Sequence, residues 1–247
     1  MRSLLANIVS GFFYKKSLRD KVRTRIRYPK TRDYIRYVKN FAGKGKPCKI
    51  KTMVEYGTSN FVVVLNDKHV FKFPLKNDGK LVAERERRIT ESLRRFSTIK
   101  IPALKVIPYK DIVIRKYEFA SGKSLTDIRP EIFVQHREHI AKQIAKFLYF
   151  VGKADPLEIR DLKKNPRDTP GYFYGWTHGD IWQNFILNPK TFNITFFINW
   201  DKVAFESILP SLRVASHHWE KFGYCGLDVD IMAEYARLFF TNYQRFV

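Results

Sequence analysis

Two stretches in the second half of the chain combine acids and amides at short spacing. The first is Thr177-His178-Gly179-Asp180, with Asn184 four residues after the Asp. An Asp after a His-Gly turn can accept a proton, and an amide oxygen four residues on can reach a metal ion. The second is Asn199-Trp200-Asp201, which follows the apolar run 194–197. A carboxylate at a strand end is a candidate metal ligand, although it is often a simple strand terminator.

Three features of the first half could together hold a phosphate group. Small residues in the turn Gly57-Thr58-Ser59-Asn60 would let backbone N–H groups approach a phosphate, although one glycine between strands is more often only a turn. Lys72 lies in the apolar strand Val-Phe-Lys-Phe, where an inward lysine needs an anionic partner and an outward one would lie on the sheet surface. Glu84 or Glu86 on the next helix could pair with Lys72, although either alone is typical of a solvated face.

Strands dominate the elements that must position these residues up to about residue 120. Aromatic and β-branched runs between turn residues predict short strands, and Leu81, Ile89 and Leu93 at wide helical spacing predict a partly exposed helix. We therefore expect two strands within 51–65, a strand over 69–73 closed by Pro74, a helix over 81–96, extended segments at 101–102 and 106–108, and a strand over 111–117.

Helices dominate afterwards. A four-residue spacing predicts a long helix over 130–151, with an apolar side formed by Ile132, His136, Ile140, Ile144 and Leu148. A Pro- and Gly-rich loop at 165–175, strands over 185–187 and 194–200, and a closing helix over 227–246 complete the pattern. This order predicts an α+β fold in two lobes, an antiparallel-sheet N-lobe and a mainly helical C-lobe, with the boundary near 117–124. The expected divisions are a basic N-terminal arm over 1–50, an N-lobe over 51–118 and a C-lobe over 119–247.

Composition and charge exclude several classes of protein. With 247 residues, 45% of them hydrophobic, the chain can bury a sizeable core and is not a disordered polymer. Its two cysteines, Cys48 and Cys225, are far apart, which excludes a disulfide framework and a cysteine zinc site and makes a reducing compartment the default. The net charge of +22 makes phosphates, nucleic acid or an acidic membrane surface the expected partners, because a polycationic substrate would be repelled.

The basic excess is concentrated in residues 1–51, which hold sixteen Lys and Arg against two acids, a net +14 of the +22. The apolar run 4–14 is about half as long as a membrane-spanning helix, and its flanks do not fit a signal peptide. An apolar patch followed by cations is typical of an interfacial anchor, so residues 1–30 are predicted to contact an anionic membrane peripherally, at its cytoplasmic face. A solvated basic helix docked on the domain is an equal alternative, and nucleic acid is a third, without a recognised binding motif.

The order of the chemical features along the chain is more informative than any one of them. Turn, Lys, Glu, linker strand, long helix, His-Gly-Asp, hairpin and strand-end Asn and Asp follow one another as in the protein-kinase-like fold. Phosphoryl transfer needs these parts: a cradle over the phosphates, a Lys held by a Glu, a base, and metal ligands from two loops.

Residues 50–215 resemble the aminoglycoside phosphotransferase and choline kinase group of the protein-kinase-like superfamily. The most specific segment is HGDIWQNFIL at 178–187, similar to the family's His-Gly-Asp, short loop, Asn and hydrophobic pair. The family's Ile-Asp-Trp-Glu stands here as Ile198-Asn199-Trp200-Asp201. Two weaker matches are Arg85-Glu86 with Leu93 before Ile101-Pro102, and Tyr117–Gly122 followed by Leu125.

The resemblance implies ATP as the cofactor and a role for each matched residue. The ATP phosphates would be covered by Gly57, Thr58, Ser59 and Asn60. Lys72 would contact the α- and β-phosphates and pair with Glu86. Adenine would meet backbone groups of Tyr117, Glu118 and Phe119. Asp180 would accept the proton of the acceptor hydroxyl, and His178 would brace its loop.

Both metal positions depart from the family. The family's metal-binding Asn lies five residues after the catalytic Asp, where this chain has Phe185; Asn184 takes its place only if the loop is one residue shorter. The family's main metal-binding Asp is Asn199, a neutral amide without the charge that holds a hard cation such as Mg²⁺. In an extended strand Asp201 would point to the same face as Asn199, about 6–7 Å away. The expected Mg²⁺ ligands are therefore Asn184, Asn199 and Asp201.

These features predict an ATP-dependent phosphotransferase that acts on a hydroxyl of a small-molecule or lipid-linked sugar. Positive charge favours an anionic acceptor, and the lipopolysaccharide-core sugar kinases, which share this fold, are the nearest picture. The alternative is a pseudokinase binding module, whose altered metal positions bind without turnover and whose arm recruits membrane, protein or nucleic acid. The retained Asp180 favours the enzyme, because a site without catalysis has little need of a base there.

Overall fold

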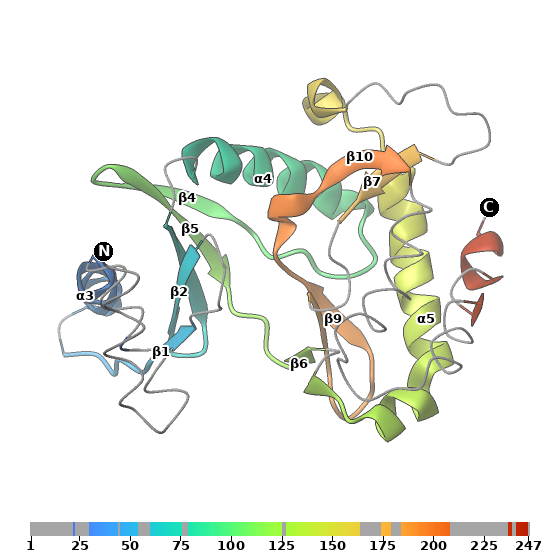
Figure 1. Cartoon of the computed structure of the whole chain (residues 1–247), viewed down its shortest axis with the longest axis horizontal. Coiled ribbons are helices and arrows are strands. Elements are labelled where there is room, and N and C mark those ends of the chain that lie inside the picture. Colours follow the sequence, from blue (N-terminus) through green and yellow to red (C-terminus); the bar gives the residue numbers. More distant parts are fainter. Residues whose placement is uncertain are drawn as a thin grey trace. The chain divides into compact units, whose positions relative to one another are not determined.

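The structure is a computed structural model of the chain, and it describes residues 22, 30–43, 45–53, 60–75, 79–124, 127–163, 174–178, 184–207, 237–238 and 241–246. Contacts divide these residues into two compact units (Figure 1). The first contains the described residues up to Glu84 together with Leu104–Phe119, and the second contains Arg85–Ala103 and the described residues from Ala120 onward. The division falls within one continuous helix, α4, over Gly79–Leu93.

The first unit is built on a five-stranded antiparallel sheet in the order β1-β2-β3-β5-β4. Its strands are β1 Ile50–Met53, β2 Asn60–Leu65, β3 His69–Pro74, β4 Lys105–Tyr109 and β5 Ile112–Glu118. The strands expected from the sequence are therefore present within a residue or two of their predicted ends. Pro108 lies in β4, an edge strand, where a residue without an N–H costs no ladder hydrogen bond on the open side.

Helix α3 (Thr31–Ala42) packs on one face of this sheet, beside β2 (Figure 1). Tyr34 and Val38 are buried on its inner side, and the Tyr34 ring stacks on Phe73 with centroids 4.4 Å apart. The core that they join consists of Phe61, Val63, Leu65, Phe71, Phe73 and Ile114. The outer side of α3 exposes Arg32, Arg36 and Lys39. This part of the expected basic arm is thus an amphipathic helix with its charge turned to solvent.

Helix α4 is continued by a short 3-10 turn, η1 (Arg94–Phe96). Together the two elements match the helix predicted over 81–96. Ile89 and Leu93 are fully buried, but Leu81 is 80% exposed. Leu81 is eight residues before Ile89, which turns it about 80° around a 3.6-residue helix. Leu81 therefore lies away from the buried side that Ile89 and Leu93 share, in a helix that is partly exposed.

The second unit is centred on a long helix, α5 (Pro130–Gly152), as the four-residue spacing predicted. Two small antiparallel sheets accompany it. One contains β6 (Lys123–Ser124), β8 (Phe185–Leu187) and β9 (Ile194–Phe197) in the order β6-β8-β9, and the other pairs β7 (Tyr174–Thr177) with β10 (Ala204–Ser207). The strand expected over 194–200 ends at Phe197 and is followed by a 3-10 turn, η4 (Trp200–Lys202).

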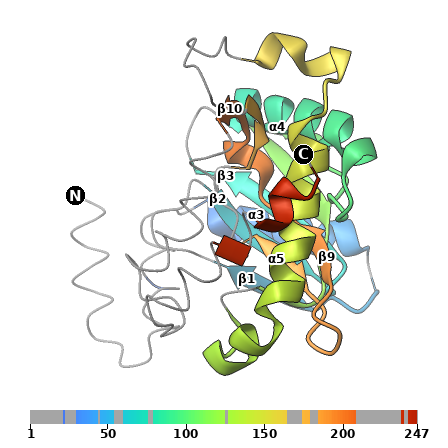
Figure 2. The same cartoon turned by 90° about the vertical axis from the view of Figure 1, so that its right-hand side faces the viewer.

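Strand β7 runs against the end of α5, and glycines make the contact possible. A Cβ added to Gly175 would lie 2.5 Å from the carbonyl oxygen of Gly152, closer than any side chain tolerates. Near the C-terminus, the rings of Tyr243 and Phe246 contact that of Tyr149 on α5. The described C-terminal helical turns lie beside α5 (Figure 2). Residues 237–238 and 241–244 are helical, as expected of the closing helix, whereas 227–236 lie outside the described residues.

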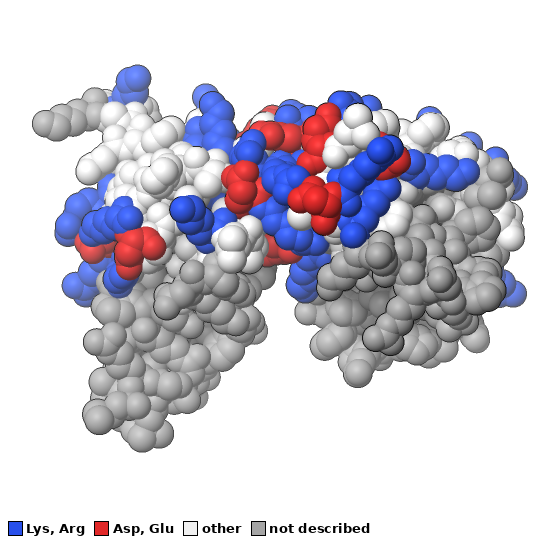
Figure 3. Space-filling model, turned by 90° about the horizontal axis from the view of Figure 1, so that it is seen from above, with Lys and Arg blue, Asp and Glu red and all other residues white. Residues whose placement is uncertain are grey.

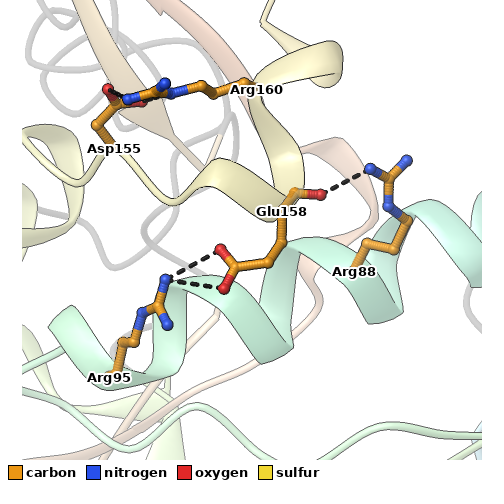
Figure 4. Close-up of polar contacts among 5 residues, drawn as sticks. All are labelled: Arg88, Arg95, Asp155, Glu158 and Arg160. Carbon is orange, nitrogen blue, oxygen red and sulfur yellow. Dashed lines mark hydrogen bonds and ion pairs between the residues drawn. The ribbon is translucent and has the colours of Figure 1, made fainter.

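Charged pairs fasten the segment after α5 to α4. Arg88 contacts the 3-10 helix η3 (Leu157–Leu162): it donates to the Glu158 carbonyl oxygen at 2.7 Å (Figure 4) and to Asp161 at 2.6 Å. Arg95 donates to the Glu158 carboxylate at 3.0 Å. In the view from above, Lys and Arg side chains lie interspersed with Asp and Glu side chains (Figure 3). This mixture is expected where surface charges form ion pairs. In the part of the chain that the structure describes, no helix is long and apolar enough to cross a membrane.

Candidate functional site

One face of the five-stranded sheet gathers polar side chains, while α3 covers the other face. The strand register places Lys72 directly opposite both Val62 on β2 and Arg115 on β5. Asn60 and Tyr117 are each two residues from these positions, so they lie on the same face. The alternate residues form the aromatic core beneath α3. The first unit therefore presents Asn60, Lys72, Arg115 and Tyr117 on the face away from α3.

Lys72 lies half-buried on this face, on the middle strand of the sheet. Its Nζ is 5.3 Å from the centroid of the Tyr117 ring, a cation–π distance. The sequence left open whether this lysine points inward or to the outer surface. Arg115 lies directly opposite Lys72 on β5, and two like charges at opposite positions of a sheet are unfavourable unless an anion lies near them.

Arg115 is a residue of this face that sequence reasoning did not single out. Its side chain is only 3% exposed, and its Nη2 donates a hydrogen bond of 2.6 Å to Oδ1 of Asn60. A signal was present in the sequence, because Arg115 lies in the middle of the apolar strand Ile-Val-Ile-Arg, where a fully solvated cation is not expected.

The two candidate glutamates, both in helix α4, differ in burial. Glu86 is 1% exposed, on the buried side that also contains Ala83, Ile89 and Thr90, whereas Glu84 is exposed. Three- and four-residue spacing places those side chains on one face, so the burial of Glu86 follows from the helical period. A buried carboxylate needs a compensating charge or donors, which sets Glu86 apart from the solvated acids of this helix.

The segment expected to meet adenine is the end of β5. The N–H of Phe119 donates to the carbonyl oxygen of Lys68 at 2.9 Å, so it serves the sheet. Successive backbone N–H groups of a strand point to opposite edges, and that of Glu118 therefore points away from β3. It lies beyond the last pair with β4, Lys105↔Lys116. Of the three residues expected to contact adenine, Tyr117 to Phe119, Glu118 is therefore the one whose backbone N–H is best placed for that contact.

In the second unit, His178 connects the end of β7 to the segment after β9. The ring is 2% exposed, and its Nε2 lies 2.9 Å from the Ile198 carbonyl oxygen. Since a carbonyl only accepts, Nε2 carries the proton. The imidazole also stacks on Phe197, with centroids 4.0 Å apart, and meets Trp200 edge-on. These contacts are those of a bracing residue, which is the role that the resemblance implied.

Asn184 begins β8 beside the same segment. Its carbonyl oxygen accepts a hydrogen bond of 3.0 Å from the Ile198 N–H, and its side chain is 5% exposed. The next residue, Phe185, is fully buried, stacked on Phe197 at 4.0 Å and edge-on to Phe147. Phe185 is thus a core residue, and Asn184 is the residue of this pair that remains a candidate ligand.

Asn199 and Asp201 do not continue a strand. Asn199 has left-handed backbone angles (φ 67°, ψ 58°), and Asp201 lies in the η4 turn that follows. The expectation of two side chains on one face of an extended strand was therefore wrong. Asn and Asp are the non-glycine residues that most readily adopt this conformation, so the backbone at 199 accepts either one. The side chains of Asn199 and Asp201 are both half-buried.

Four predicted site residues lie outside the described part of the chain. They are Gly57, Thr58, Ser59 and Asp180. The described neighbours on either side of Asp180 are His178 and Asn184, and both are joined to Ile198.

The donors available for Mg²⁺ are two amides and one carboxylate, all oxygen ligands of the kind that this ion prefers. Among the described residues, no group of three or more His, Cys, Asp or Glu side chains could hold a metal ion. Asn184, Asn199 and Asp201 stay predicted ligands; their oxygens suit Mg²⁺ chemically, but by themselves they would make only a partial site.

The chain has the two-lobed, kinase-like fold of small-molecule phosphotransferases. It is similar to the aminoglycoside phosphotransferase APH(2'')-Ib with ADP bound, with a TM-score of 0.63 and 15% identity over 85% of this chain and 81% of that one. A ternary complex of streptomycin, ATP and APH(2'')-IIa gives a TM-score of 0.62 and 15% identity over 85% and 81%. The macrolide 2'-phosphotransferase MphH from Brachybacterium faecium gives 0.56 and 12% over 87% and 83%.

These likenesses confirm the α+β fold and the structural resemblance predicted from the His-Gly-Asp segment. No protein-family model matches the chain, and no curated protein matches its sequence.

Proposed function

We propose that this chain is an ATP-dependent phosphotransferase whose acceptor is a hydroxyl group. The observation that carries the proposal is the polar face of the sheet, where Lys72, Arg115 and Asn60 are brought together by register on the side away from α3. Such a group of donors fits a polyphosphate. The fold supports the same assignment, because solved relatives of this fold contain ADP or ATP.

In this proposal the first unit binds the nucleotide. Lys72 contacts the α- and β-phosphates. The pairing of Lys72 with Glu86 that the resemblance implied stays a prediction, supported by the burial of the Glu86 carboxylate. The turn from Gly57 to Asn60 covers the phosphates, and the backbone at Glu118 contacts adenine.

The second unit supplies the base. The acceptor oxygen bonds to the γ-phosphorus as the bond from that phosphorus to the β–γ bridging oxygen breaks, and ADP leaves. The hydroxyl proton passes to the Asp180 carboxylate. His178 holds the chain just before this residue through its bond to Ile198.

Magnesium would be held by Asn184, Asn199 and Asp201 together with phosphate oxygens. When bound, the ion neutralises charge on the β- and γ-phosphates. Asn199 contributes an oxygen without a charge, so we expect weaker metal binding than a carboxylate at this position would provide.

The acceptor class follows from charge. Aminoglycosides are polycations, and a chain with a net charge of +22 repels them. We propose an anionic acceptor, a lipid-linked sugar such as a lipopolysaccharide core, reached at the inner face of a membrane through residues 1–30. The neutral Asn199 favours one alternative, a pseudokinase that binds nucleotide without turnover.

Thermal unfolding with ATP, with and without Mg²⁺ or Mn²⁺, tests the nucleotide site. ATP at about a hundred times its dissociation constant should add about 2.7 kcal/mol to the free energy of unfolding. We expect metal-dependent stabilisation of the unaltered chain and a larger one for Asn199→Asp. Lys72→Met should abolish both.

The outcomes separate the two functions. Stabilisation by ATP with metal, followed by phosphorylation of an anionic sugar, supports the enzyme. Stabilisation that appears only in Asn199→Asp would indicate a kinase site disabled at one residue. The phosphotransferase assignment is wrong if ATP stabilises neither protein.

A further inference from the structure

The hydrogen bond between Arg115 and Asn60 spans three strands. Asn60 is on β2 opposite Pro74, and Arg115 is on β5 opposite Lys72, so the bond passes over β3 between Lys72 and Pro74. Strands two apart in a sheet are separated by about 9.6 Å. Only a long side chain can cover that distance, and the guanidinium therefore lies beside the position of Lys72.

This bond decides which end of the Asn60 amide faces which way. A guanidinium has only donors, so the atom at 2.6 Å must be the Asn60 carbonyl oxygen. The amide nitrogen, with two N–H donors, is then the other end of that side chain. Both residues are buried, at 8% and 3% exposure, so neither side chain can turn freely.

We propose that Arg115 is a positioning residue of the nucleotide site, which holds the Asn60 carboxamide so that its N–H donors face the nucleotide phosphates. The inference rests on the proposed function and adds to it a residue that is in none of the motifs on which the resemblance was based. Phosphate oxygens only accept hydrogen bonds, so an amide turned the other way would oppose them with its carbonyl oxygen. Arg115 also places a second positive charge beside Lys72.

The alternative is a bond that merely stiffens the sheet, and Asn60→Asp distinguishes the two. An aspartate keeps an oxygen acceptor for Arg115, so a purely structural bond survives and gains charge assistance. The same change replaces the N–H donors with a carboxylate oxygen. We expect the affinity for Mg·ATP to fall at least tenfold, while the midpoint of thermal unfolding without nucleotide is not lowered.

The test measures equilibrium binding of Mg·ATP and of adenosine to the full chain and three variants. Asn60→Asp and Arg115→Met should each lose at least tenfold in ATP affinity. Their adenosine affinity should stay within about twofold, because adenosine has no phosphate for these residues to contact. Lys116→Met is the matched control, because Lys116 is the next residue of β5 but packs against Phe41 on the α3 side. Its ATP affinity should stay within about twofold.

Two results would overturn the assignment of Arg115 while leaving the proposed function intact. One is ATP affinity within twofold of the unaltered chain in Asn60→Asp. The other is an equal loss of ATP and adenosine affinity in Arg115→Met, as expected of a general distortion of the sheet. If the unaltered chain binds no ATP, the proposed function fails, and the role of Arg115 fails with it.

Discussion

Phe185 occupies the position at which the resembling family has a metal-binding amide, and its surroundings explain why it cannot take that role. The ring is fully buried, with Phe197 stacked on it and Phe147 edge-on. The backbone of the preceding residue, Asn184, is joined to Ile198. Phe185 belongs to the core of the second unit, and Asn184, one residue earlier, stays the proposed ligand.

Restoring the family's amide should consequently damage the protein rather than improve it. Phe185→Asn removes an aromatic ring from the core and buries an amide among apolar side chains, which should cost about 3–5 kcal/mol of unfolding free energy. Urea unfolding measures this cost. As a control, Phe185→Leu keeps the site apolar and should cost only about 1–2 kcal/mol. A stable Phe185→Asn protein with tighter Mg·ATP binding would show that position 185 faces the metal after all.

At the scale of elements, η3 shows how charge pairs fix a connection that has little core of its own. Ile159 is its buried residue, and Leu157 is 70% exposed. Arg88 of α4 and Arg95 of η1 hold it, and Asp155, just before it, accepts hydrogen bonds from Arg160 (Figure 4) and from Lys163. The described segment after α5, residues 155–163, is therefore held largely by ion pairs.

One of these pairs should make stability depend on acid pH. Hydrogen bonds from Arg160 and Lys163 lower the pKa of Asp155 to about 2, from an ordinary 3.8. A depressed carboxyl pKa stabilises the folded chain above about pH 4, and this contribution is lost as the pH falls toward about 2. Asp155→Asn should therefore unfold at a lower temperature than the unaltered chain at pH 6, with the gap closing between about pH 4 and pH 2.

The same measurement in high salt checks the cause. Because the carboxylate is solvent-exposed, added NaCl should narrow the gap at pH 6. In a chain that already carries Arg160→Gln, adding Asp155→Asn should lower the unfolding temperature less than it does in the unaltered chain. Only the contact of Asp155 with Lys163 is then left to lose. A gap that persists unchanged down to pH 2 would contradict the assignment.

For the whole molecule, the surplus of positive charge is the dominant property. Ion pairs neutralise part of it, as Asp67 does for Lys49 and Lys51 and as Asp111 does for Lys30. Residues 1–29 alone contribute eight Lys and Arg against one acid. Such a segment would draw the chain toward an anionic bilayer, where a lipid-linked acceptor would be found.

Vesicle flotation tests this attraction. The full chain should float with vesicles that contain phosphatidylglycerol, remain in solution with neutral vesicles, and be released at about 0.5 M NaCl, where the screening length falls to a few ångström. Removal of residues 1–29 should abolish flotation. This deletion retains Lys30, whose bond of 2.8 Å to Asp111 ties α3 to the sheet. Equal flotation of both forms would assign membrane contact to another surface.

Local patterns were enough to predict most elements and the chemical order of the site. The strands at β1, β2, β3, β5 and β8 and the helix α5 follow from alternation, turn residues and a four-residue spacing, all of which act over a few residues. Lys72, Glu86, Asn184 and Asn199 were also recognisable from residue type and spacing. Their proposed roles in binding and catalysis rest on that pattern and on the fold.

Tertiary structure decided what depends on contacts between distant segments. The sequence could not place Arg115 against Asn60, because the strand register brings together residues 55 positions apart. Residue type and helical spacing alone did not separate Glu86 from Glu84; the resemblance favoured Glu86, and the packing of α4 shows that Glu86 is the buried one. Local pattern also did not predict that the chain turns at Asn199 instead of extending to Trp200. Burial and hydrogen bonding are properties of neighbours in space, so they appear only when the fold brings those neighbours together.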